Sequence, residues 1–231
     1  ADAEKRAGGE GFVSYTFTAP ELDPLAVLET LDEPAPRGYF ENPSRKRSHA
    51  AGSPLRQWAG RGDQRFVEAD RWLRDIDASL TCVGPRPRVI ATFPFYPGSD
   101  IEGAQAKLFL PSWQVVSEDG LTTVTLCELA TPGCAARLAI RAESFRKFSY
   151  RSNPPPPRAP VPTVLSEVGG SWFPSAVVRA TELIKEGSFE KIVLSRAFDW
   201  RRSEPFSIYA TLHRLRRGNP PCHTFLVDEA E

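Results

Sequence analysis

The feature that most constrains this chain is the segment "SNPPPPRAPVP", from Ser152 to Pro162. Its four consecutive prolines fix φ and remove four backbone N–H donors, so neither a helix nor a strand can run through it. A run of this kind forms a stiff polyproline-type connector. We therefore expect an exposed connector at residues 152–162, with one region before it (1–151) and another after it (163–231).

The region before the connector is predicted to be mostly β, with one long helix. "FVSYTF", at residues 12–17, alternates apolar and hydroxyl residues as a half-buried strand does, and "EDG" at 118–120 is typical of a hairpin turn. Asp23 and Pro24 suit the N-cap and first position of a short helix. The long helix is predicted from apolar residues spaced by three and four: Phe66, Ala69, Leu73, Ile76 and Leu80.

The region after the connector reads as helix, strand, helix, strand. Pro174 suits a helix start and Gly187 a helix end, and a strand is then predicted from Lys191. A second helix is expected between Pro205 and Gly218, before the final strand "HTFLVD". With nothing predicted to follow that strand, this region looks incomplete.

Charge and cysteine usage exclude several classes of protein. Lysines and arginines number 29, as do the acidic residues, so nothing argues for nucleic acid as a partner. No window approaches about 18 consecutive apolar residues, which argues against a membrane span. The four cysteines lack close metal-ligand spacing, and we interpret them as reduced, small core residues of a cytoplasmic protein.

A charged amine, Lys191, stands at the head of the segment "EKIVLSR", which otherwise reads as a buried strand. A lysine at a strand edge commonly extends into solvent or discourages edge pairing. The other interpretation is a functional amine, held beside Ile192 and Leu194 so that its uncharged form is favoured. The residues alone leave both open.

The segment "GSFEKIVLSRAF", followed by "LRRGNPPCHTFLV", resembles the central part of the chorismate-utilising enzymes. Upstream, "GDQRFVEADRWL" and "ATFPFYP" with "LFLPSWQVV" are similar to segments of the isochorismate synthases, so the resemblance extends from about Tyr39 to the end. The downstream positions that carry it are Lys191, Leu194, Ser195, Arg196, Leu215, Arg216, Asn219, Pro220 and Phe225.

The resemblance implies an α+β fold with mainly antiparallel sheets flanked by helices, as in the ADC synthase-like fold. Chains of that family are about twice as long as this one. It therefore also implies that this sequence corresponds to the N-terminal half and is truncated before the C-terminal catalytic half.

The implied activity is that of an isochorismate synthase acting on chorismate, with Lys191 as the base that activates water. Relatives that add ammonia carry glutamine at this position as a rule, so lysine accords with water as the nucleophile. A salicylate synthase is the alternative among these enzymes, and both menaquinone and siderophore precursors remain open. The resemblance also implies a Mg²⁺ cofactor whose ligands lie beyond Glu231, so that the chain alone is expected to be inactive.

Other candidate residues have weaker support. Ser195 and Arg196 either line the site or serve the structure, and no substrate-binding residue is assigned. His213 and His223 lie near the motif but have no arrangement typical of a catalytic triad. A different class of function is a catalytically inactive product of a split or decayed gene. It would act as a binding or interaction module and pair with a separately encoded C-terminal half.

Overall fold

The computed structural model describes residues 11–20, 22–95, 105–147, 164–168, 172–201 and 205–228. The predicted connector at 152–162 lies outside these residues. Contacts divide the chain into two compact units, one made of residues 1–155 and 209–231 and the other of residues 156–208. The last helix and strand therefore belong with the N-terminal unit, whereas the sequence had suggested grouping them with the region that follows the connector.

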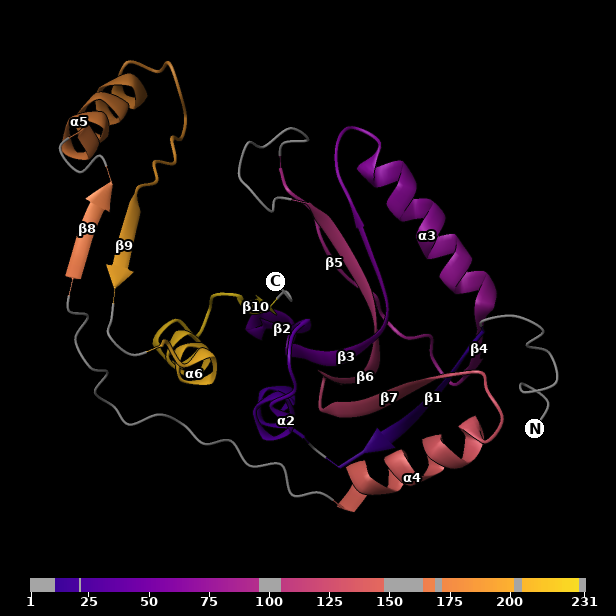
Figure 1. The fold of residues 1–231 in the computed structure, drawn as a ribbon. Helices are drawn as coiled ribbons and strands as arrows, with labels where there is room; N and C mark the ends of the chain where they lie inside the picture. Colours follow the sequence, from indigo (N-terminus) through magenta and orange to yellow (C-terminus); the bar gives the residue numbers. More distant parts are fainter. Residues whose placement is uncertain are drawn as a thin grey trace. The chain divides into compact units, whose positions relative to one another are not determined.

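The larger unit is built on an eight-stranded sheet in the order β10-β2-β3-β6-β7-β1-β4, with β5 paired to β6 (Figure 1). Its pairings are antiparallel except for that of β1 with β4. This confirms the expected α+β fold with a mainly antiparallel sheet. The strands are β1 (Phe12–Ala19), β2 (Arg37–Asn42), β3 (Arg47–Gly60), β4 (Leu80–Val83), β5 (Ile90–Thr92), β6 (Ala106–Glu118), β7 (Leu121–Leu129) and β10 (Thr224–Asp228).

Helices cover both faces of this sheet. They are α2 (Pro24–Leu31), α3 (Arg65–Ser79), α4 (Cys134–Lys147) and α6 (Ile208–Gly218), with a short 3₁₀ helix at Pro43–Arg45. Phe12 packs with Ile76 of α3, whereas its neighbour Val13 faces Leu138 of α4. Because successive side chains of a strand point to opposite faces, α3 and α4 lie on opposite sides of β1.

Local signals account for several boundaries. Asp23 caps α2, its Oδ1 accepting a hydrogen bond of 3.0 Å from the Leu25 amide, and Pro24 takes the first helical position, as predicted. The hairpin between β6 and β7 turns through Asp119 and Gly120, whose φ angles are 51° and 81°. Two positive φ values in succession are typical of a type I′ turn, which confirms the predicted turn at "EDG".

The long helix is present, but its expected apolar face is only partly buried. Ala69 and Ile76 are buried, while the side chains of Phe66 and Leu73 are 53% and 39% exposed. The spacing of the apolar residues by three and four positions correctly predicted a helix. It did not indicate how much of that face the sheet would cover, because coverage depends on the tilt of the helix over the strands.

The smaller unit consists of α5 (Trp172–Lys185) and a two-stranded antiparallel sheet of β8 (Val164–Val168) and β9 (Ala197–Arg201). Gly187, with φ of 74°, follows α5 as predicted. The strand predicted to begin at Lys191 is wrong in position, because residues 191–196 have no regular structure. The physical reason is the register of the hairpin, which aligns Val168 with Ala197 and so starts the ladder there.

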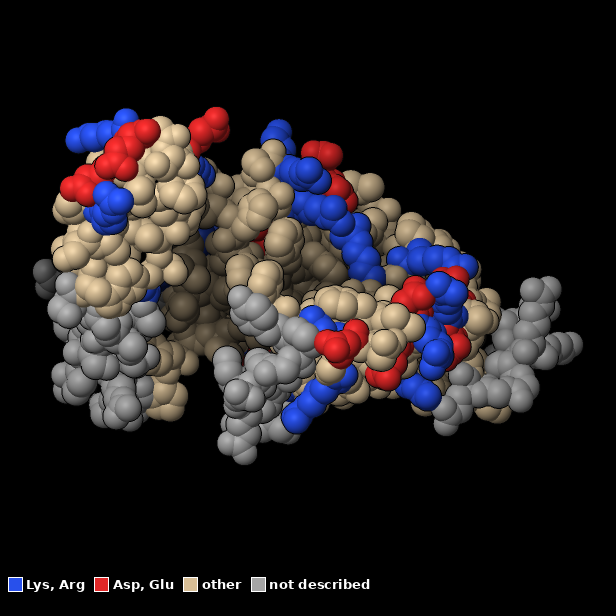
Figure 2. Space-filling view, turned by 90° about the horizontal axis from the view of Figure 1, so that it is seen from above, with Lys and Arg blue, Asp and Glu red and all other residues tan. Residues whose placement is uncertain are grey.

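Charge on the surface is mixed rather than gathered into a field of one sign. Figure 2 shows Lys and Arg side chains interspersed with Asp and Glu on the face that it presents. Among the residues that the structure describes, no helix is long and apolar enough to cross a membrane. All four cysteines are free thiols. Cys127 and Cys134 are buried, but Cys222 is exposed, so not every cysteine is a core residue.

Candidate functional site

Lys191 lies in the smaller unit, in the irregular segment that leads from α5 to β9. Its side chain is exposed, and so are those of Ser195 and Arg196. The expected burial beside apolar neighbours is not present, since Ile192 and Leu194 are only half-buried and α5 has no buried residue. One helix and two strands bury too little surface to enclose a side chain, so Lys191 is open to water and to a ligand in this structure.

Arg196 is held by an aromatic ring of the same unit. Its guanidinium carbon lies 4.8 Å from the centre of the Phe173 ring, which is a cation–π contact. The guanidinium therefore covers apolar surface of α5. This is the structural role that the sequence offered for Arg196 as the alternative to lining the site. Because Phe173 belongs to α5, this contact holds the Arg196 side chain against that helix.

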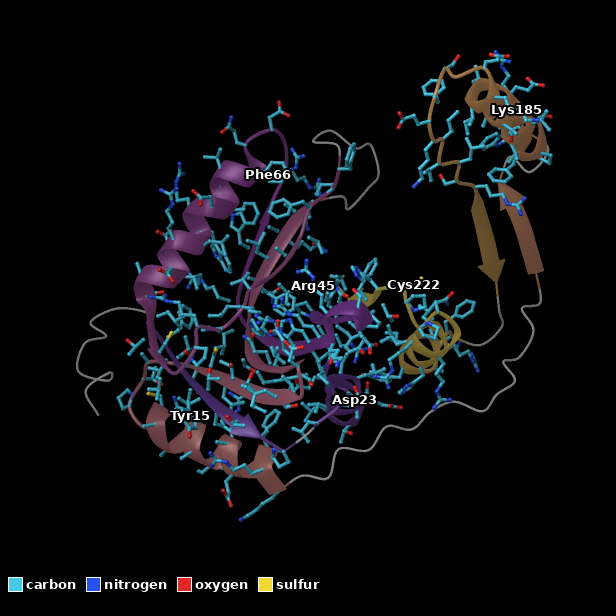
Figure 3. The ribbon with its side chains drawn as sticks, turned by 180° about the vertical axis from the view of Figure 1, so that it is seen from behind. Tyr15, Asp23, Arg45, Phe66, Lys185 and Cys222 are labelled. Carbon is cyan, nitrogen blue, oxygen red and sulfur yellow. The ribbon has the colours of Figure 1, made fainter. Side chains whose placement is uncertain are left out.

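Arg216, a residue of the motif that carried the family resemblance, belongs to the larger unit and makes a two-pronged ion pair there. Its Nη1 and Nη2 donate to Asp23 Oδ1 and Oδ2 at 3.0 and 2.9 Å, and its Nε lies 3.9 Å from Glu41. Figure 3 shows Asp23 at the N-terminal end of α2, beside α6. Burial lowers the pKa of Arg216, but the hydrogen bonds and the negative charge of Asp23 more than offset this, so the pKa is raised overall. Arg216 thus ties α6 to α2.

A second polar cluster joins the same elements. Arg37 Nε donates to Asp228 Oδ2 at 2.7 Å, and Arg37 Nη1 donates to the Tyr209 hydroxyl at 2.8 Å. The fully buried His213 contacts Glu29, with Nε2 and Oε2 3.0 Å apart. His213 therefore serves the packing of α6 in this structure, and the charged run from Arg214 to Arg217 contains at least one structural ion pair.

A third cluster, which the sequence had not singled out, surrounds His49 on β3. Its neighbours are Arg47, Arg88, Gln114 and Glu118. Burial first, and then the two guanidiniums, lower the pKa of His49 to about 4. The sequence contained one indication of this cluster. Arg47 and His49 are two residues apart, so in a strand their side chains share one face.

The described residues do not fit a magnesium site. Among them, no three or more His, Cys, Asp or Glu side chains are gathered in an arrangement that would hold a metal ion. Hard divalent cations such as Mg²⁺ require oxygen ligands, carboxylates above all. The expectation of Mg²⁺, whose ligands the family resemblance places beyond Glu231, stays a prediction.

An eight-stranded, mainly antiparallel sheet covered by helices, together with a smaller unit of one helix and a two-stranded sheet, defines an α+β protein. The chain belongs to the chorismate binding enzyme family, whose family model matches residues 1–231. The family resemblance expected from the sequence is thereby confirmed. A search of curated proteins found no match.

Two solved structures are similar to the chain. One is MenF, the menaquinone-specific isochorismate synthase of Escherichia coli, with 21% identity, a TM-score of 0.62, and coverage of 96% of this chain and 49% of MenF. The other is DhbC of Bacillus anthracis, named as a 2,3-dihydroxybenzoate-specific isochorismate synthase, with 18% identity, a TM-score of 0.47, and coverage of 90% and 44%. The likeness to MenF confirms the fold. The chain spans about half the length of these structures.

Proposed function

We propose that this chain supplies the N-terminal half of an isochorismate synthase, in which Lys191 is the base that activates water. The observation that carries the proposal is the match of the chorismate binding enzyme family over residues 1–231, in a chain with lysine at the head of "KIVLSR". The fold shared with MenF supports it. The proposal covers the reaction and leaves the choice between a menaquinone and a siderophore precursor open.

The reaction exchanges a hydroxyl group. Water adds at carbon 2 of chorismate while the hydroxyl on carbon 4 leaves, so a base must take a proton from water and an acid must protonate the leaving group. In this proposal the Lys191 amine takes the proton. An amine accepts a proton only in its neutral form, and the enclosure of Lys191 by bound chorismate would favour that form. The acid comes from the rest of the enzyme.

The exposure of Lys191 accords with this role in one respect. A base that acts on water must be reached by both water and substrate. Among the described residues, no carboxylate forms an ion pair with Lys191. The acidic residues of α5, Glu182 and Glu186, pair with Arg179 instead.

The proposal is tested with the complete protein in water enriched in ¹⁸O. Chorismate is supplied, the product is identified by mass spectrometry, and the wild type is compared with Lys191→Gln. Because glutamine cannot accept the proton, turnover should fall by about 10²–10⁴-fold, the usual contribution of a general base. Lys185→Gln is the matched control, since Lys185 is also exposed and lies on α5 of the same unit (Figure 3).

The wild-type protein should place one ¹⁸O atom in isochorismate, and the control should keep wild-type turnover. Lys191→Gln with turnover within a few-fold of wild type would refute the assignment of the base. Salicylate with pyruvate as the products would identify a salicylate synthase instead. Absence of any turnover by the complete protein would favour the interaction module.

A further inference from the structure

The chain reverses its direction at the end of α5. The amide of Gly187, whose φ is 74°, donates to the Ile184 carbonyl, and the amide of Ser188 donates to the Leu183 carbonyl, both at 3.0 Å. Two hydrogen bonds of this spacing form a Schellman motif, which ends a helix at a residue with positive φ. The residues that follow, 188–196, are called the return segment. Its first end is thus fixed to the C-terminal turn of α5.

The other end of the return segment is held at the opposite end of the same helix. Arg196 is its last residue, and its guanidinium carbon lies 4.8 Å from the centre of the Phe173 ring. Phe173 is the second residue of α5, is half-buried, and meets the Trp172 ring edge-on with 5.7 Å between the ring centres. α5 has 14 residues and is therefore about 20 Å long. The return segment runs back over that length between two attachment points (Figure 1).

Burial alternates along the return segment between these two points. Ile192 and Leu194 are half-buried, whereas Lys191, Val193 and Ser195 are exposed. Ile192 and Leu194 are thus turned toward atoms that cover them, and the side chains between them are turned away. A segment that is fixed at both ends keeps this alternation, and with it the direction of the Lys191 amine. A segment fixed at one end only could rotate and exchange the two sets of side chains.

We propose that Phe173 and Arg196 are positioning residues for Lys191. Neither of them transfers a proton. Their contact fixes the far end of the return segment, and so fixes the distance and direction of the amine relative to α5. The inference rests on the proposed role of Lys191 as the base. Because a base acts only from the correct position, a released segment contributes almost no turnover, and activity follows the population of the held segment.

Turnover of chorismate by the complete protein is measured for Phe173→Leu and Phe173→Tyr. Leucine keeps an apolar side chain without a π face, whereas tyrosine keeps the ring. A cation–π contact at a surface shifts an equilibrium by about two- to fivefold, and a desolvated one by more, so kcat should fall about threefold to tenfold in Phe173→Leu. KM should stay within about twofold, because the base and not the binding of substrate is affected. Phe173→Tyr should stay within about 1.5-fold of wild type.

The effect of Phe173→Leu should depend on the presence of Lys191. In a protein that already carries Lys191→Gln, adding Phe173→Leu should change turnover by less than about 1.5-fold, because no base remains to be positioned. A phenylalanine that serves only the stability of the unit would lower turnover by the same factor in both backgrounds. That result would overturn the inference.

Arg196→Gln tests the other half of the contact, and Arg179→Gln is its matched control. Arg179 lies on α5 of the same unit, but its guanidinium pairs with Glu182 and Glu186, at 3.2 and 3.6 Å. Arg196→Gln should reproduce the loss seen in Phe173→Leu, and Arg179→Gln should keep wild-type turnover. Equal losses in the two arginine variants would also overturn the inference. If Phe173→Leu does not fold, Arg196→Gln with and without Lys191→Gln makes the same comparison.

A measurement that needs no turnover separates this inference from the proposed function. A lysine-specific protease cleaves after Lys191 faster when the return segment is released, so Phe173→Leu should raise that rate by about threefold to tenfold, while Phe173→Tyr should not. Cleavage after Lys147, an exposed residue of α4 in the larger unit, is the internal reference.

The two measurements together distinguish the possible failures. Unchanged cleavage and unchanged turnover in Phe173→Leu would overturn the positioning role while leaving Lys191 as the base. Wild-type turnover in Lys191→Gln would refute the base, and with it any positioning role in catalysis. Faster cleavage in Phe173→Leu, combined with a loss of turnover that disappears in the Lys191→Gln background, supports the inference.

Discussion

The buried His49 should make the stability of the larger unit depend on pH. Burial and the two nearby guanidiniums lower its pKa from 6.5 to about 4, so the folded protein keeps the ring neutral where an unfolded chain would protonate it. Between these two values unfolding takes up a proton. Stability is therefore fully present above about pH 6.5 and is lost as the pH falls toward 4.

The size of the effect follows from the linkage relation. A displacement from 6.5 to about 4 corresponds to about 3 kcal/mol of unfolding free energy in total, and to about 2 kcal/mol between pH 7 and pH 5. Because His49 is only 8% exposed, solvent screening does not reduce this figure much. The pH dependence of the whole protein includes contributions besides that of His49, so the test must compare two proteins rather than two pH values.

The comparison is between the wild type and His49→Gln, unfolded in urea at pH 7, 6 and 5. Glutamine keeps a hydrogen-bonding side chain but cannot titrate, so the wild type should lose about 2 kcal/mol more than the variant between pH 7 and 5. His223→Gln is the control, since His223 is exposed and its ring centre lies 5.6 Å from that of Phe40, and it should retain the wild-type dependence. Parallel pH profiles for the wild type and His49→Gln would refute the assignment of the effect to His49.

Changes at two further positions probe the packing of the larger unit. Asp23→Asn keeps an oxygen for the Leu25 amide but removes the charge that Arg216 contacts, so it should lower the free energy of unfolding in urea by about 1 kcal/mol. Asp23→Ala also loses the helix cap and should lower it by about 1 kcal/mol more. Equal losses in the two variants would show that the cap contributes nothing. Gly52→Ala would place a Cβ 2.8 Å from Cζ2 of the buried Trp113, which should cost about 1–3 kcal/mol. A thermal unfolding midpoint unchanged from wild type would contradict the close packing at this position.

Several parts of this protein were predictable because their causes lie close together in the sequence. Asp23 and Pro24 adjoin the helix that they start, and "EDG" contains the glycine that its turn requires. The family was also predictable, from short segments such as "KIVLSR" in their order along the chain. In each case a few neighbouring residues decide the outcome, whatever surrounds them.

Other features were decided only by the tertiary structure. β10 pairs with β2, placing Phe225 opposite Phe40, although the sequence suggested that this strand belonged with the region after the prolines. Alternation of side chains predicts which face of a strand is buried, but not which strand lies beside it, because pairing depends on contacts between distant residues. The same pairing of distant strands and loops brings Arg88 and Gln114 to His49. Neither the burial of that ring nor the charged groups around it could therefore be derived from residues 47–49 alone.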